Sequence, residues 1–205
     1  MPFDSFRSIR EIATTFQITL RLEPFIQLLP VAVDEWFLSD LSFTRSHVAV
    51  RVSEAAIGEF LVAPVLKQVW RPYSDVLTFW SHIPLGTQEP LIGFADYVFC
   101  RRSALGLVLD QPYVIVVEAK KDDFEGGWAQ CLAAMLAAQR MNDDPAQRIF
   151  GIVSNGNSWQ VGKLDQSVFT QELRDFVISD PTELLAALNA VFDYVREQLT
   201  AGAAL

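Results

Sequence analysis

Residues 113–121 read YVIVVEAKK, an apolar run that ends on an acid and two lysines. Its first five residues are β-branched or aromatic and predict a buried strand. Because side chains alternate along a strand, Glu118 and Lys120 are expected on the same side. A second apolar segment upstream, GFADYVF at 93–99, contains Asp96. The pattern predicts two strands that bring Asp96, Glu118 and Lys120 into one site.

These three residue types suit a metal-dependent phosphodiester-cleaving site. Asp96 and Glu118 would hold Mg²⁺ or Mn²⁺, since such cations take one or two carboxylates and complete their shell with water and substrate phosphate. Lys120 would orient the attacking water or stabilise charge at phosphorus. The alternative is two solvent-exposed acids with Lys120 in a salt bridge. An acid in so apolar a run favours the ligand interpretation, because burying an unpaired carboxylate is costly.

Several segments resemble the PD-(D/E)xK nuclease superfamily, which has the restriction-endonuclease-like fold. They are GFADY at 93–97, VVEAKK at 116–121 and Gln130 in the segment that follows, with Ala95 where the family name has proline. The stretch IFGIVSNGNSWQVGKL at 149–164 is similar to the strand-turn-strand in nuclease domains of type I restriction subunits.

The resemblance implies an α/β fold of restriction-endonuclease-like class, with a central mixed β-sheet flanked by helices in the order α-β-β-β-α-β. It implies a single domain, 1–205, with a nuclease-like core at about 53–165 and additions at 1–52 and 166–205. It also implies cleavage of nucleic acid, with DNA as the expected partner and a protein partner or homodimer in addition.

Further site residues follow from the same resemblance. The Ala119 carbonyl is the implied third protein ligand of the metal. Gln130 is expected to line the site and position the lysine or water, although relatives often carry an aromatic residue at the position of Ala134. An acid from the expected helix at 53–70 should contact metal-bound water. Glu54 and Glu59 lie five residues apart, about 140° around a helix, so both cannot face one spot. Glu59 is preferred, because it lies deeper in an apolar helix and five residues before Pro64, as in similar sequences.

Periodicity and turn signals predict the remaining elements. Ser53 is a good N-cap, and Pro64 would kink the helix that follows. Asp122 or Asp123 caps a later helix, and Asn155-Gly156-Asn157 predicts a hairpin turn. The expected helices are 4–15, 53–70, 124–141 and 181–199, and the expected strands are 76–83, 92–101, 112–119, 149–154 and 158–163.

Composition bounds the function. The chain has 205 residues, 51% of them hydrophobic, and two cysteines, which form neither a disulfide framework nor a zinc site. With no expected signal peptide or membrane span, a reducing cytoplasmic location is predicted. His82 and four tryptophans are expected to be structural: Trp70, Trp80, Trp128 and Trp159.

The net charge of −9 opposes duplex binding, which needs cations to neutralise phosphates. Basic residues should therefore gather around the site, with the acidic charge elsewhere. The candidates are Arg101, Arg102, Lys120, Lys121, Lys67 and Arg71. The charge keeps two alternatives open: a non-catalytic module of nuclease fold that binds a protein or nucleic-acid partner, and a small-molecule phosphohydrolase.

Overall fold

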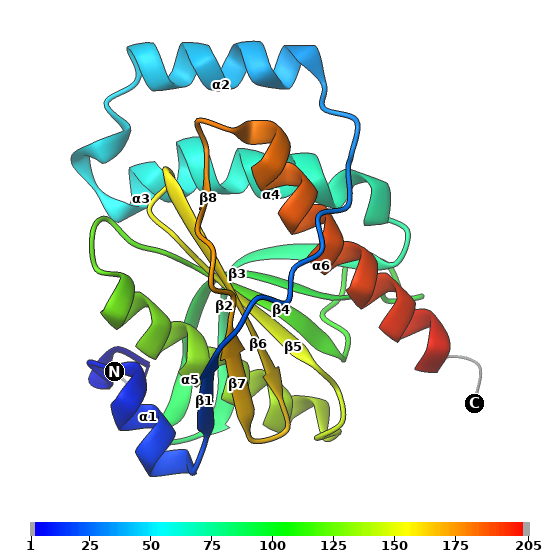
Figure 1. Ribbon diagram of the computed structural model, residues 1–205. Helices are drawn as coiled ribbons and strands as arrows, with labels where there is room; N and C mark the ends of the chain where they lie inside the picture. Colours follow the sequence, from blue (N-terminus) through cyan, green and yellow to red (C-terminus); the bar gives the residue numbers. More distant parts are fainter. Residues whose placement is uncertain (1–2, 203–205) are drawn as a thin grey trace.

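One mixed β-sheet of eight strands organises the computed structural model, which describes residues 3–202 (Figure 1). The strand order is β1-β7-β6-β5-β4-β3-β2, and β8 pairs with β6. The strands are β1 Thr19–Leu22, β2 Leu77–Gln88, β3 Leu91–Arg101, β4 Tyr113–Ala119, β5 Ile149–Ser154, β6 Ser158–Asp165, β7 Val168–Gln171 and β8 Phe176–Val177. The helical segments are η1 Phe3–Ser5, α1 Ile9–Phe16, α2 Glu35–His47, η2 Val50–Val52, α3 Glu54–Ile57, η3 Gly58–Val62, α4 Ala63–Trp70, η4 Arg71–Tyr73, α5 Phe124–Asn142 and α6 Pro181–Gly202.

The centre of the sheet is an antiparallel meander followed by a crossover. Strands β2, β3 and β4 pair antiparallel in succession, α5 then crosses over, and β5 pairs parallel to β4. All seven residues of β4 are buried, as expected for a strand covered on both faces. The predicted order of one helix, three strands, a helix and a hairpin is confirmed.

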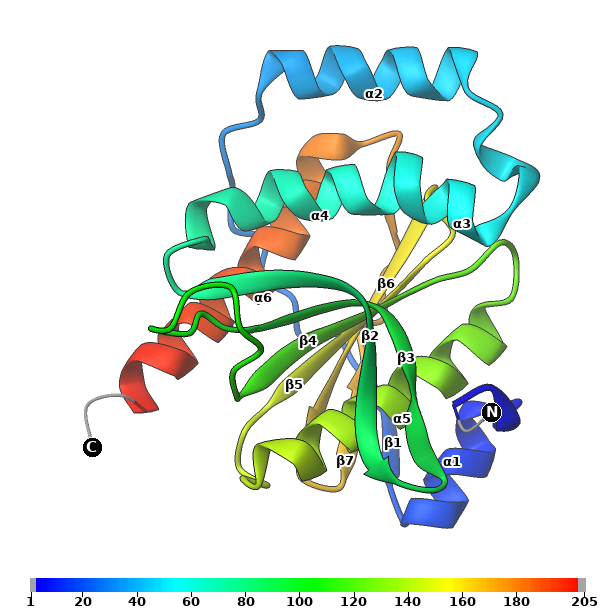
Figure 2. The ribbon, with the colours of Figure 1, turned by 180° about the vertical axis from the view of Figure 1, so that it is seen from behind.

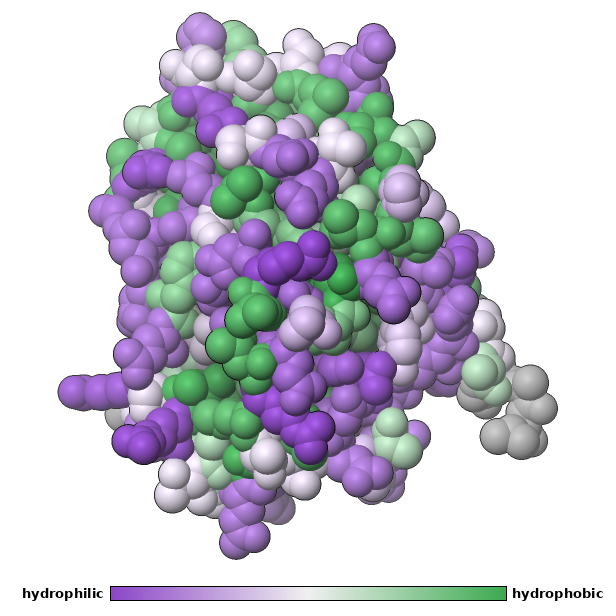
Figure 3. Space-filling model, in the orientation of Figure 1, coloured by the Kyte–Doolittle hydropathy of each residue, from purple (hydrophilic) through white to green (hydrophobic). Residues whose placement is uncertain are grey.

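Helices cover both faces of the sheet. On one face α5 packs against the central strands, and α1 packs beside α5. On the other face α4 and α6 contact each other, and α2 forms an outer layer beyond α4 (Figures 1 and 2). Two hydrophobic cores result, one on each side of the sheet. On the face seen in Figure 1, hydrophilic and hydrophobic residues are interspersed over the surface (Figure 3). Within residues 3–202, no helix is sufficiently long and apolar to traverse a bilayer.

The helix from Glu54 to Trp70 is continuous but widens in the middle. The Ser53 hydroxyl accepts a hydrogen bond from the Ala56 N–H at 3.1 Å, which confirms the predicted N-cap. At Gly58–Val62 the helix makes a π turn, in which the Ala63 N–H bonds to the carbonyl of Gly58. Pro64 follows immediately and has no N–H to offer the preceding turn. The irregularity predicted at Pro64 is therefore a π turn just before it.

The segments at the two ends of the chain hold elements that the sequence did not predict. They are β1 and α2 on the N-terminal side, and β7 and β8 on the C-terminal side. Strand β1 lies parallel to β7 at the sheet edge, and the chain then runs along the molecule to α2 (Figure 1). Buried Glu172 fixes this connection, since its carboxylate accepts hydrogen bonds from the N–H groups of Phe25 and Ile26, both at 2.7 Å.

Several element boundaries differ from the prediction. The first helix begins at Ile9 rather than residue 4, because Ser8 caps it by accepting a bond from the Glu11 N–H. Strand β2 extends to Gln88, where it turns tightly into β3. Of the four tryptophans expected in the core, Trp128 and Trp159 are buried, whereas Trp70 and Trp80 are half-buried.

Candidate functional site

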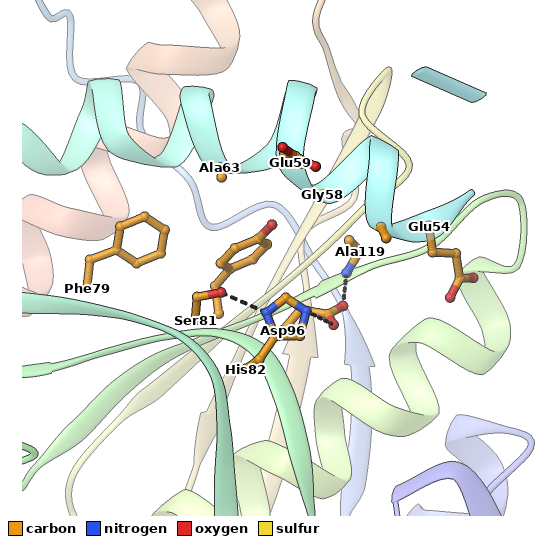
Figure 4. A pocket seen from close by; sticks show the side chains of 11 residues that line it. Glu54, Gly58, Glu59, Ala63, Phe79, Ser81, His82, Asp96 and Ala119 are labelled. Atoms are coloured by element: carbon orange, nitrogen blue, oxygen red, sulfur yellow. Dashed lines mark hydrogen bonds and ion pairs between the residues drawn. The ribbon is translucent and has the colours of Figure 1, made fainter. Parts of the chain in front are cut away.

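A cleft of about 590 Å³ lies between the Glu54–Trp70 helix and strands β2 and β3 (Figure 4). The helix contributes two acids to its lining, and the strands contribute a third acid, a histidine and two aromatic rings. The lining residues are Glu54, Ala55, Gly58, Glu59, Ala63, Phe79, Ser81, His82, Asp96, Tyr97 and Ala119.

Asp96 enters the cleft from β3 and contacts the neighbouring strand. Its Oδ2 accepts a hydrogen bond from the Ala119 N–H at 2.8 Å. Tyr97 of β3 pairs with Val117 of β4. Because the strands are antiparallel, continuing this register by one residue places Asp96 opposite Glu118. The two acids therefore come from adjacent strands, β3 and β4.

Glu118 and Lys120 form a compact charged pair at the end of β4. Glu118 is 3% exposed, and its Oε2 lies 3.9 Å from the Lys120 Nζ. The Lys120 side chain runs across α5 at Gly127, where a Cβ would lie 2.9 Å from its Cγ. Glycine at 127 therefore leaves room for the lysine stem. The alternative considered for Lys120, a salt bridge, is present with Glu118. This salt bridge does not conflict with a role of Lys120 in the reaction.

The charges of this site act on two neighbouring groups. Burial, and then the negative charge of Glu118, raise the pKa of the Cys131 thiol, while Lys120 opposes the rise. Burial also raises the pKa of Tyr97 to about 12, assisted by the charges of Asp96 and Glu59. Both groups are therefore neutral at physiological pH.

Glu54 and Glu59 both line the cleft, but they lie at different places along it. The cleft extends along the helix, and the π turn changes the angular spacing near Glu59. Glu54 makes the closer contacts: its Oε2 lies 3.8 Å from the Lys120 Nζ, and its Oε1 accepts from the Lys121 N–H at 3.3 Å. The preferred acid, Glu59, makes no such contact with Lys120 in the described part of the chain.

Gln130 and Ala119 lie beside these groups. Gln130 is half-buried on α5, three residues beyond Gly127, so it shares the helix face that Lys120 crosses. Ala119 lines the cleft, with its N–H bound to Asp96. Lys121, one of the cations expected around the site, is exposed.

His82 was expected to be structural, but it lies in the cleft with a side chain 66% exposed. Its Nε2 is 3.8 Å from Oδ1 of Asp96, and its Nδ1 is 2.7 Å from the Ser81 hydroxyl (Figure 4). Its backbone has φ of 52°, which is uncommon for a residue other than glycine. The signal that would have identified it is the register of β2 on β3, which places residue 82 opposite residue 96.

The basic residues do not all gather at the cleft as expected. Arg101 pairs with Asp110 at 3.2 Å, and Arg102 donates to the Ser74 carbonyl at 3.0 Å. Both follow Asp96 by five or more positions, about 17 Å along an extended strand. The prediction that they surround the site is wrong. Lys67 and Arg71 instead line a second hollow that adjoins the cleft.

The side chains of the cleft suit a hard divalent cation. Carboxylate and carbonyl oxygens are the ligands that Mg²⁺ and Mn²⁺ prefer. Among residues 3–202, no three His, Cys, Asp or Glu side chains come together as a metal-binding group, so Glu59 does not join Asp96 and Glu118 in such a group. Two carboxylates with water and a substrate phosphate are a usual Mg²⁺ shell. Comparisons with models of known protein families and with curated protein sequences found no match for this chain.

Proposed function

We propose that this chain is a divalent-metal-dependent nuclease that hydrolyses phosphodiester bonds of nucleic acid. The observation that carries the proposal lies at the end of β4: Asp96, which lines the cleft, accepts a hydrogen bond from the Ala119 N–H at 2.8 Å, and the flanking Glu118 and Lys120 pair at 3.9 Å. The arrangement combines acids for a cation with an ammonium group for phosphate charge.

The fold is consistent with this proposal. An antiparallel meander, a crossover helix and a parallel strand follow one another in the order expected of the restriction-endonuclease-like class. We assign the chain to that class as part of the proposal. Its two cysteines are both free and buried, in keeping with the reducing cytoplasmic location that we propose.

Each residue has a distinct part in the proposed reaction. Asp96 and Glu118 hold Mg²⁺ or Mn²⁺, together with the Ala119 carbonyl. Bound there, the cation would lower the pKa of a coordinated water and offset phosphate charge. Lys120 stabilises the negative charge that develops at phosphorus. Glu54 restrains the lysine head group, which lies 3.8 Å from its carboxylate.

A non-catalytic, partner-binding module is the second candidate. It is favoured by the net charge of −9 and by the engagement of Arg101 and Arg102 away from the cleft. Such a module would keep the acidic pocket without turning over nucleic acid.

Cleavage assays distinguish the nuclease from the non-catalytic, partner-binding module. Plasmid, single-stranded DNA and RNA are incubated with Mg²⁺ or Mn²⁺ and the wild-type chain, Lys120→Ala or Lys121→Ala. We expect cleavage by the wild type and by Lys121→Ala. The Lys121→Ala variant is the matched control, because Lys121 is the exposed neighbour of Lys120. We expect loss of about 100-fold or more in Lys120→Ala, the scale of removing one transition-state donor. Equal activity of the two variants, or none in the wild type, contradicts the proposal.

A further inference from the structure

A second hollow, of about 350 Å³, lies between α2 and α4. We call it the α2–α4 groove. Glu59, Ala63 and Phe79 line both this groove and the cleft, so the two adjoin. A chain lying in the groove would therefore continue directly toward Asp96.

Two cations line the groove, one from α4 and one from η4, which follows it directly. Lys67 and Arg71 stand one helical turn apart, and neither side chain makes a hydrogen bond or ion pair within the described residues. This is unlike Arg101, which is held by Asp110. Three acids, Asp34, Asp40 and Glu59, line the same groove, but no ion pair engages either cation among the described residues, so both can contact an anion.

An aromatic side chain is exposed on the opposite wall. Trp36 lies in the first turn of α2, is 70% exposed and lines the groove. Its neighbours Asp34 and Asp40 also line the groove, and Asp34 is occupied in capping the Trp36 N–H at 2.9 Å. An exposed indole opposite free cations offers a base-stacking surface beside phosphate contacts.

We propose that the α2–α4 groove binds an unpaired nucleic-acid strand and directs it to the cleft, an inference that rests on the proposed nuclease function. Trp36 stacks on a base, and Lys67 and Arg71 contact phosphates. A stacking residue needs a base whose face is open, which a single strand offers and a continuous duplex does not. The substrate class is therefore single-stranded nucleic acid, or a single-stranded segment beside a duplex.

Binding is measured by fluorescence anisotropy with labelled oligo-dT, oligo-rU and a duplex, in Ca²⁺ to prevent cleavage. The wild type is expected to bind single strands more tightly than the duplex. Trp36→Ala should weaken single-strand binding about 5- to 150-fold, the range of one stacked base. The control is Phe43→Ala, an aromatic residue of the same helix that is 59% exposed and does not line the groove.

The cations are tested by the salt dependence of binding. Lys67→Ala/Arg71→Ala should reduce the slope of log K against log salt by about 1.4, because each phosphate contact on a single strand contributes about 0.7. Arg10→Ala, an exposed residue of α1, should leave the slope unchanged. Tighter binding of the duplex, or groove variants indistinguishable from their controls, overturns the inference. The dT and rU arms distinguish DNA from RNA.

These results are separable from failure of the nuclease proposal. Groove-dependent binding with no Lys120-dependent cleavage supports the groove and contradicts the enzyme. Lys120-dependent cleavage of substrates bound equally well by Trp36→Ala contradicts the groove and supports the enzyme.

Discussion

The carboxylate of Glu54 lies 3.8 Å from the ammonium of Lys120, so the start of the helix and the end of β4 meet across the cleft. Lys120 thus has two acidic neighbours, because Glu118 Oε2 also lies 3.9 Å from its Nζ. The Glu54 side chain is 51% exposed and the Lys120 side chain 13%, so this contact is the outer of the two.

Glu54 is expected to act through the lysine. Glu54→Gln should lower kcat about tenfold, equivalent to about 1.4 kcal/mol, with little change in KM, because it disturbs the position of Lys120 and not substrate binding. Glu59→Gln is the matched control and should change kcat less. A larger effect of Glu59→Gln would instead favour the metal-water role first expected for that acid. Steady-state cleavage kinetics measure the difference.

Divalent cations should stabilise the folded protein through Asp96 and Glu118. At a concentration 100 times the Kd, Mg²⁺ or Mn²⁺ adds about 2.7 kcal/mol, which corresponds to a rise in Tm of about 5–10 °C for a chain of this size. Asp96→Asn and Glu118→Gln should remove most of this rise. Glu197→Gln, an exposed acid of α6, should retain it. Calorimetric scans with an identical rise in all variants would contradict the assignment.

Gly58 is required by the close approach of the helix to β3. A Cβ at this position would lie 2.8 Å from the Tyr97 hydroxyl oxygen. Gly58→Ala should therefore destabilise the fold by about 1–3 kcal/mol, the usual cost of overpacking. In a Tyr97→Phe background, which removes the oxygen, the cost of Gly58→Ala should fall. Urea unfolding of the four chains of this double-mutant cycle gives the coupling energy; additive costs would contradict the contact.

Glu172 should make stability depend on pH. Burial alone would raise its pKa, but the N–H groups of Ile26, Phe25 and Arg174 and the Arg174 guanidinium outweigh burial and hold the pKa below its usual value of 4.5. A lowered pKa stabilises the fold above pH 4.5, and the contribution is lost as pH falls through the folded-state pKa.

Glu172→Gln is therefore expected to cost about 1.5–3 kcal/mol at pH 7, as for hydrogen bonds to a charged group. The difference from wild type should shrink as the pH is lowered below 4. Urea unfolding at pH 7, 5 and 3.5 measures it, with Glu197→Gln as the control. A difference that stays constant with pH would show that the carboxylate charge has no part in the effect.

Much of the central fold is predictable because its signals are local. Ser53 and Asp123 both cap the helices that they were expected to cap. The apolar run before Glu118 is the buried strand β4, and the Asn155–Asn157 turn joins a hairpin. Each of these features depends on a few adjacent residues, so it can be predicted without knowing the strand register or the tertiary contacts.

The missed elements depend on partners far away in the sequence. Strand β1 has four exposed residues and no alternation of burial, so pairing with β7 alone defines it. The position of His82 depends on register, and a shift between Leu85 and Gln88 makes counting from the β2–β3 turn unreliable. The Glu54 contact depends on how the helix lies against β4, which the sequence pattern does not encode.

The pairing of Thr19 with Val168 and of Leu22 with Gln171 has a consequence for synthesis on the ribosome. The β1 segment leaves the exit tunnel long before β7, its partner strand, is translated. Until then β1 has no strand to pair with, and closing so long a loop is slow. Until β7 is available, β1 and the following segment that carries Trp36 would remain undocked from the sheet. Leu22 of β1 is 61% exposed even in the folded chain. Strand β1 therefore docks only after β7 has been made, although it is translated well before it.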